Sequence, residues 1–218
     1  MNTDAIGLMM EGRHDDALEL FHDALEKAKE AFDSKKMDLE MATVTTAAQT
    51  CLYEISLDQV IYPYDCSERA SPDNCFRVYR HVFAVAEMHG LTTGTVLRKT
   101  LAVVAYNMGL FYHECGLACA DGYMISRALC FYNIAVTVVQ NQDLVGEQDP
   151  GLVPFELALY NNLGHVHGIY SNREGASSCL GRVRETIARW GSSGDETTAF
   201  FLPRGYSSHS HLHKAPAA

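Results

Sequence analysis

The sequence lacks the cysteine patterns of disulfide-rich and zinc-binding proteins. Its seven cysteines are odd in number, are scattered from Cys51 to Cys179, and contain no Cys-x-x-Cys pair. This spacing argues against a disulfide framework and against a common zinc site. We therefore expect the cysteines to be reduced, and most of them to serve as small core residues.

Long apolar runs and a secretory signal are also missing. No uninterrupted apolar stretch approaches the roughly 20 residues that a membrane-spanning helix needs. Residues 1–4 lack the basic patch and the apolar core of a signal peptide. Together with a composition of 47% hydrophobic and 20% charged residues, these absences predict a soluble intracellular protein, with the cytoplasm as its expected compartment.

Basic residues are scarce relative to acidic ones. Seventeen Lys and Arg stand against 27 Asp and Glu, which gives a formal net charge of -10. Such a chain repels the phosphates of nucleic acid and the anionic face of a membrane. Neither is an expected partner, and a basic protein or peptide is favoured instead.

The common catalytic motifs do not occur. The sequence has no Gly-x-x-x-x-Gly-Lys, Gly-x-Gly-x-x-Gly, Gly-x-Ser-x-Gly or His-Glu-x-x-His, so the usual routes to phosphate binding, dinucleotide binding, acyl transfer and zinc proteolysis lack their signatures. We predict that the protein is not an enzyme and that it needs no cofactor.

One cluster combines residues with catalytic or metal-binding chemistry. Cys115 and Cys119 would face the same way on a helix, with His113 nearby. A metal site would need a fourth ligand, which only Cys130 or His167 would supply in a favourable fold. No oxyanion-donor motif accompanies a Cys-His pair here. We expect no metal site, and a hydrolase using Cys115 or Cys119 is the least favoured alternative.

Apolar residues spaced three and four apart predict a helical chain. The expected helices cover about residues 3–11, 15–32, 37–57, 95–115, 123–140, 155–170 and 173–190. Turn-forming residues predict loops at 61–75 and 141–154, while alternation of apolar and polar residues at 76–83 predicts a short extended segment. Residues 195–218, which include the tail motif His209-x-His211-x-His213, predict a disordered tail.

The helix pairs repeat a sequence pattern. Residues 105–112 align without a gap over residues 160–167, so that Asn107-Met108-Gly109 matches Asn162-Leu163-Gly164. The second helices of the pairs share a small, a large and a small residue at the same spacing. These sets are Ala17, Phe21 and Ala24; Ala128, Tyr132 and Ala135; and Ala176, Leu180 and Val183.

This pattern resembles that of the tetratricopeptide repeat family, in which a Gly of the first helix lets the second helix approach closely. No repeat has the family's Trp or closing Pro, and the second carries about seven extra residues. The resemblance implies an all-α fold of helix-turn-helix repeats stacked into a short irregular solenoid. The implied domain covers residues 1–194, with repeat-like pairs at about 3–32, 102–140 and 157–190, a spacer at 33–100, and the tail at 195–218.

The resemblance also implies a concave groove that binds a peptide. In some family members, asparagines at the position of Asn107 and Asn162 grip the backbone of an extended peptide, because an amide both donates and accepts. We expect these amides to be open to solvent in the free protein; the alternative is that they tie helix to helix. The expected groove residues are Tyr106, Asn107, Leu110, His113, Asn161, Asn162 and His165.

The expected function is that of an adaptor or scaffold that binds a protein or peptide in this groove. Some family members bind the C-terminal carboxylates of a chaperone through a set of residues that includes a Lys in the first helix. This chain has Tyr106 and Asn161 at that position, so carboxylate-terminal chaperone tails are not favoured ligands. An architectural subunit without a peptide site is the main alternative. The sequence indicates neither the partner nor the oligomeric state.

Overall fold

The computed structural model describes residues 1–35, 52–57, 76–85, 93–140, 150–190 and 200–201. This part of the chain is mainly helical, which confirms the predicted all-α character, and it also holds one small sheet. Its elements are α1 (Asn2–Met10), α2 (His14–Lys35), β1 (Leu52–Ser56), β2 (His81–Val85), α3 (Thr93–Cys119), α4 (Gly122–Gln140), the 3-10 turn η2 (Pro150–Leu152), α5 (Val153–Ile169) and α6 (Arg173–Trp190).

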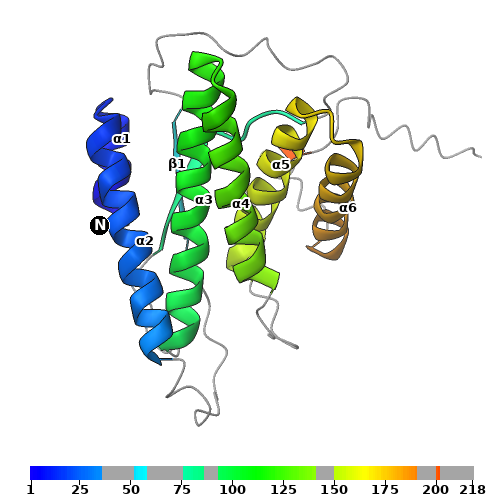
Figure 1. Ribbon diagram of the computed structural model, residues 1–218. Coiled ribbons are helices and arrows are strands. Elements are labelled where there is room, and N and C mark those ends of the chain that lie inside the picture. The colour runs from blue at the N-terminus through cyan, green and yellow to red at the C-terminus, as the bar shows by residue number, and fades with distance from the viewer. Residues whose placement is uncertain (36–51, 58–75, 86–92, 141–149, 191–199, 202–218) are drawn as a thin grey trace, which may run out of the picture.

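The helices form three pairs that lie side by side in chain order (Figure 1). Helix α1 packs on α2, α3 on α4, and α5 on α6, while α2 contacts α3 and α4 contacts α5. The first helices of the last two pairs, α3 and α5, also touch each other. Because only two or three residues connect the helices within each pair, the two members must run antiparallel.

The same backbone turn closes each pair. The two amides that follow the last turn of the helix donate to carbonyls three and five residues back, at 2.9 to 3.4 Å, which is the Schellman arrangement. The first of these residues has a positive φ in every pair: 76° at Gly12, 53° at Ala120 and 55° at Ser171. Only glycine adopts this conformation without steric cost, so the second and third turns are strained.

Polar side chains then cap the second helices of the last two pairs. A carboxylate oxygen of Asp121 accepts a hydrogen bond from the amide of Tyr123 at 2.8 Å. The side-chain oxygen of Asn172 accepts one from the amide of Gly175 at 3.0 Å. These caps satisfy amides that have no partner inside the helix, so both boundaries are set by local sequence.

Glycines bring the layers close together. A Cβ built on Gly109 of α3 would lie 2.7 Å from ring atoms of Tyr132 in α4, so the tyrosine ring packs directly on the α3 backbone. Gly164 of α5 also lies against an aromatic ring, that of Phe76, which precedes β2 and occupies the space of the missing Cβ. The matching glycines thus receive an aromatic ring from different parts of the chain.

Strands β1 and β2 form an antiparallel pair, from Leu52 opposite Val85 to Ser56 opposite His81. The predicted helix at 37–57 is therefore wrong at 52–57, and its remainder lies outside the described residues. The extended segment predicted at 76–83 is confirmed at 81–83, which belong to β2, while residues 76–80 lead into the strand without regular secondary structure. Strand β2 packs along α3 and also touches α1, so part of the predicted spacer 33–100 lies against the helices.

Two other predicted segments are only partly described. The loop expected at 141–154 is described from residue 150 onward, where η2 leads directly into α5. In the tail expected at 195–218, the described residues Phe200 and Phe201 are helical, and Phe201 is buried. A disordered tail is therefore wrong for these two residues.

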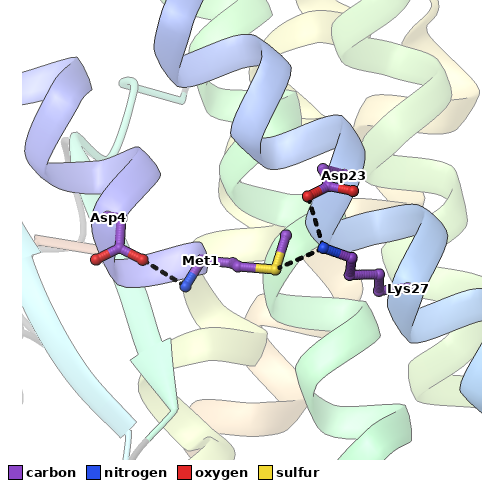
Figure 2. A network of polar contacts seen from close by, with 4 residues as sticks. All are labelled: Met1, Asp4, Asp23 and Lys27. Carbon is purple, nitrogen blue, oxygen red and sulfur yellow. Dashed lines mark hydrogen bonds and ion pairs between the residues drawn. The ribbon is translucent and has the colours of Figure 1, made fainter.

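A surface network joins α1 and α2, as Figure 2 shows. The Lys27 ammonium lies 2.9 Å from a carboxylate oxygen of Asp23 and 3.5 Å from the sulfur of Met1. The amino group of Met1 lies 2.6 Å from Asp4, and this contact lowers the pKa of the Asp4 carboxyl. Because these groups are largely solvated, the ion pairs add little to stability.

Within the described residues, α4 is the one helix whose length and apolar content would suffice to cross a membrane. It packs between α3 and α5 and buries Ile125, Ala128, Phe131, Tyr132 and Ala135. Core helices often have the same composition, so this property is weak evidence for a membrane span.

Candidate functional site

One edge of β2 faces the first helices of the repeats. The amide of Leu57 donates to the carbonyl of Arg80 at 2.8 Å, which extends the pairing with β1. Backbone groups of alternate residues in a strand point the same way. The odd-numbered residues from 77 to 83 therefore turn their amides and carbonyls away from β1 and toward α3 and α5.

Asn107 of α3 pairs with both backbone groups of Phe83. The amide of Phe83 donates to Oδ1 of Asn107 at 3.0 Å, and Nδ2 of Asn107 donates to the carbonyl of Phe83 at 2.8 Å. Nδ2 also donates to Oδ1 of Asn2 at 3.1 Å, and Nδ2 of Asn2 reaches the same Phe83 carbonyl. Asn107 thus replaces one residue of a neighbouring strand.

Asn162 of α5 holds Tyr79 in the same way. The amide of Tyr79 donates to Oδ1 of Asn162 at 2.7 Å, and Nδ2 donates to the carbonyl of Tyr79 at 3.0 Å. The preceding residue of α5, Asn161, donates from Nδ2 to the carbonyl of Arg77 at 2.6 Å. The two asparagines at one repeat position therefore hold backbone units four residues apart.

Tyr106 fills the interval between these contacts. Its hydroxyl donates to the carbonyl of His81 at 3.1 Å and accepts a hydrogen bond from Nδ2 of Asn162 at 3.1 Å. The side chain is fully buried, and burial raises the pKa of the Tyr106 phenol well above its usual value. Tyr106 therefore stays a neutral donor in a row of bonds from residue 77 to residue 83.

The predicted groove residues come together, but they are not open to solvent. Asn107 and Asn162 are 0% exposed, so the expectation of free amides is wrong. Both asparagines bond an extended segment of the same chain, which neither reading expected. Each also bonds a side chain of another helix, as the alternative held: Asn107 bonds Asn2 of α1, and Asn162 bonds Tyr106 of α3. All seven predicted residues are buried, namely Tyr106, Asn107, Leu110, His113, Asn161, Asn162 and His165.

Side chains of residues 76–85, which form the extended segment, enter the helical core at three places. The ring of Phe76 lies on Gly164. Phe83 meets Tyr106 and Phe155 edge to face, with ring centroids 5.4 Å apart in both pairs. Tyr79 lies 4.7 Å from the ring of Phe201. Backbone bonds and buried aromatic rings together hold the segment.

A partly buried ion pair joins the segment to α3. The guanidinium of Arg80 lies 3.0 Å from a carboxylate oxygen of Glu114, whose side chain is only 8% exposed. Glu114 is the only Asp, Glu, Lys or Arg between Leu101 and Ala120. A buried carboxylate needs a cation, so this isolated charge in the sequence indicated an ion pair. The sequence did not indicate that Arg80 would be the partner.

Two histidines of the predicted groove bond each other instead of the segment. Nε2 of His113 lies 3.0 Å from Nδ1 of His165, and Nδ1 of His113 lies 3.3 Å from the hydroxyl of Tyr132. Burial lowers the pKa of His165 to about 4 and that of His113 well below its usual value. Both rings are therefore neutral near pH 7, and they link α3, α4 and α5.

Burial makes Cys115 a poor nucleophile. Burial raises the pKa of the Cys115 thiol to about 12, so almost none of it is thiolate at neutral pH. Cys119 is exposed. Across the described residues, no three or more His, Cys, Asp or Glu side chains gather as a metal site would require.

Sequence reasoning identified the asparagines but missed several residues that complete the arrangement. Asn2 joins Asn107 on the Phe83 carbonyl, while Phe76 and Arg80 supply the main side-chain contacts of the segment. Alternation at 76–83 indicated extended structure, yet no pattern in it pointed to the groove.

Comparison with known proteins adds no relative: no protein-family model, no curated protein and no solved structure matches this chain.

Proposed function

We propose that this protein is a tetratricopeptide-like adaptor that binds an extended segment of another protein in the groove formed by α3 and α5. The observation that carries the proposal is the paired grip of Asn107 and Asn162, each of which bonds the amide and the carbonyl of one residue in an extended chain. Because these bonds go to the backbone of the bound chain, they are compatible with many ligand sequences.

The arrangement of the helices supports the repeat assignment. Antiparallel pairs stack in chain order, and the first helices of the last two pairs, α3 and α5, contact each other as well as their partners. The close approach of Tyr132 to Gly109 occurs at the position where the repeat pattern calls for a small residue. The raised pKa of Cys115 makes the hydrolase alternative less attractive still.

The proposal is tested by selecting peptides from a random library on the folded protein. A selected peptide should bind with a defined stoichiometry and should shift the side-chain amide NMR signals of Asn107 and Asn162, because it exchanges their partners. If the bound peptides leave these signals unmoved, or if no peptide is selected, the groove is not the binding site.

An architectural role is the second candidate, and one observation favours it. Every predicted groove residue is buried, and Tyr106, Asn107, Asn161 and Asn162 bond the protein's own segment, as expected of a groove that never opens. Native-state hydrogen exchange separates the two functions. In an architectural subunit, the amides of Tyr79 and Phe83 exchange only with global unfolding; in an adaptor, they exchange through a local opening of lower free energy.

A further inference from the structure

We infer that the partner of the groove is an extended peptide that reproduces the side-chain register of residues 76–83, with aromatic residues at the positions of Phe76 and Phe83 and a cation at that of Arg80. The segment 76–85 is then a built-in competitor for its own groove. This inference rests on the proposed function and specifies the partner's chemistry.

The backbone contacts fix the register without selecting a sequence. Asn162 holds one residue, Tyr79, and Asn107 holds the residue four positions later, Phe83. In extended chain, residues an even number apart point their backbone groups the same way. Any extended peptide can therefore satisfy both asparagines, and specificity must come from the side chains between and beside them.

The first selective position is the surface of α5 at Gly164. The ring of Phe76 occupies the space of the missing Cβ, so it lies directly on the helix backbone, and Phe76 is only 4% exposed. A flat aromatic ring makes more contacts in such a shallow, closely approached space than a short aliphatic side chain does. The partner should carry an aromatic residue here.

Glu114 selects a cation four residues further along. Its carboxylate is nearly buried and lies 3.0 Å from the Arg80 guanidinium. A peptide that supplies a cation at the position of Arg80 regains this charge-assisted contact with the nearly buried carboxylate, and a peptide without a cation there loses it. The net charge of -10 on the whole chain attracts a basic peptide as well.

The third selective position lies between α3 and α5. Phe83 is fully buried there and meets Tyr106 and Phe155 edge to face. These contacts exploit the negative face and the positive edge of aromatic rings, so a second aromatic residue is preferred seven positions after the first.

Competition within one chain is strong, because a tethered segment has an effective concentration on the order of millimolar. A free peptide at micromolar concentration should therefore bind the wild-type chain poorly. Removing side-chain contacts from the tethered segment, while leaving the groove itself intact, should increase the apparent affinity for the peptide.

The experiment uses the full chain and a fluorescent synthetic peptide with the sequence of residues 76–85, monitored by anisotropy. The double variant Phe76→Ala, Arg80→Ala should bind this peptide at least tenfold more tightly than wild type. Val183→Ala, which removes a buried contact in α6 away from the groove, is the matched control and should show no gain. If the double variant does not fold, the single variant Arg80→Ala is compared with wild type in the same binding assay.

Each outcome has a distinct meaning. A peptide in which Ala replaces Phe76 and Arg80 should bind the double variant at least tenfold more weakly than the original peptide. Equal binding by wild type and double variant, or an equal gain in Val183→Ala, would overturn the competitor inference alone. If the peptide binds no variant while library peptides shift the asparagine signals, the register is wrong and the adaptor function stands. Failure of both kinds of peptide removes both proposals.

Discussion

Asparagine side chains act in this protein as substitutes for the backbone of a neighbouring strand. An amide group carries one acceptor and two donors, and Asn107 and Asn162 use both kinds to hold Phe83 and Tyr79. Since the edge of β2 is buried against helices, its amides and carbonyls need such partners. These side chains are therefore part of the folded core, whatever else they bind.

Replacing either asparagine should destabilise the protein. Asn107→Ala and Asn162→Ala each leave a buried amide and carbonyl without their side-chain partners, so the free energy of unfolding should fall by about 2 to 4 kcal/mol. Urea denaturation monitored by circular dichroism measures this. Asn133→Ala on the exposed face of α4 is the control and should change stability by less than about 0.5 kcal/mol. Equal stability of all three variants would mean that the segment does not occupy the groove in solution.

The buried histidine pair should make stability fall in mild acid. The pKa of His165 is about 4 in the folded protein against 6.5 for an ordinary histidine. Above pH 6.5 the ring is neutral in both states; between pH 6.5 and 4 only the unfolded state takes up the proton. The free energy of unfolding should therefore drop by up to about 3 kcal/mol over this interval.

Urea denaturation at several pH values tests this expectation. His113 contributes in the same direction, because its pKa is also lowered. His165→Gln keeps a polar side chain that does not titrate, so the variant should show a shallower dependence on pH. An unchanged slope would mean that other groups cause the acid sensitivity.

At the scale of elements, the helix pairs are closed by local turn chemistry. Each turn contains one residue with positive φ. In the last two pairs the next residue is polar and caps the second helix. The first pair uses Gly12, whereas the others place Ala120 and Ser171 in this conformation. The strain in these two turns is compensated by the packing of the helices they connect.

Relief of this strain is measurable at Ala120. Ala120→Gly should raise the free energy of unfolding by roughly 1 kcal/mol, because an L-residue with a side chain pays about this cost in the left-handed region. Ala118→Gly, two residues earlier within α3, should instead lower it by about 0.5 to 1 kcal/mol. Thermal melts of both variants decide the matter, and a decrease in both would show that the turn is not strained.

At the scale of the whole molecule, contacts between distant segments hold the layers together. The bond between Asn162 and Tyr79 links residues 83 apart in sequence, and Asn2 reaches Phe83 across 81 residues. Phe201, near the other end of the chain, packs on Tyr79. Residues 76–85 therefore connect the first helix, the two later helix pairs and residues 200–201.

Truncation tests the contribution of the last contact. A chain that ends at residue 199 loses Phe200 and Phe201, and with them a nearly buried aromatic ring. Its free energy of unfolding should be about 1.5 to 3 kcal/mol lower than that of a chain ending at residue 201. Comparing these two truncations isolates the phenylalanines, and equal melting temperatures would show that they do not pack on Tyr79.

The sequence alone determined the helices of the three pairs. Their periodicity and turn residues act over a few positions, so α1, α2, α3, α4, α5 and α6 were predicted to within a few residues. It also placed Asn107 and Asn162 at one repeat position, since an alignment needs no coordinates. The apolar spacing at 52–57 led to a wrong prediction of helix, because a short apolar run is compatible with a helix or a strand.

Only the tertiary structure decided what lies against Asn107 and Asn162. Pairing between the segment 76–85 and the asparagines depends on residues 24 to 83 positions away, and nothing within the segment itself specifies them. The buried bonds of Asn107, Asn161 and Asn162 come from that pairing, whereas His113 and His165 bond each other between the helices. An isolated Glu114 in an apolar stretch indicated a missing cation, but the choice of Arg80 required the two elements to meet in space, because ion pairing depends on distance rather than on sequence.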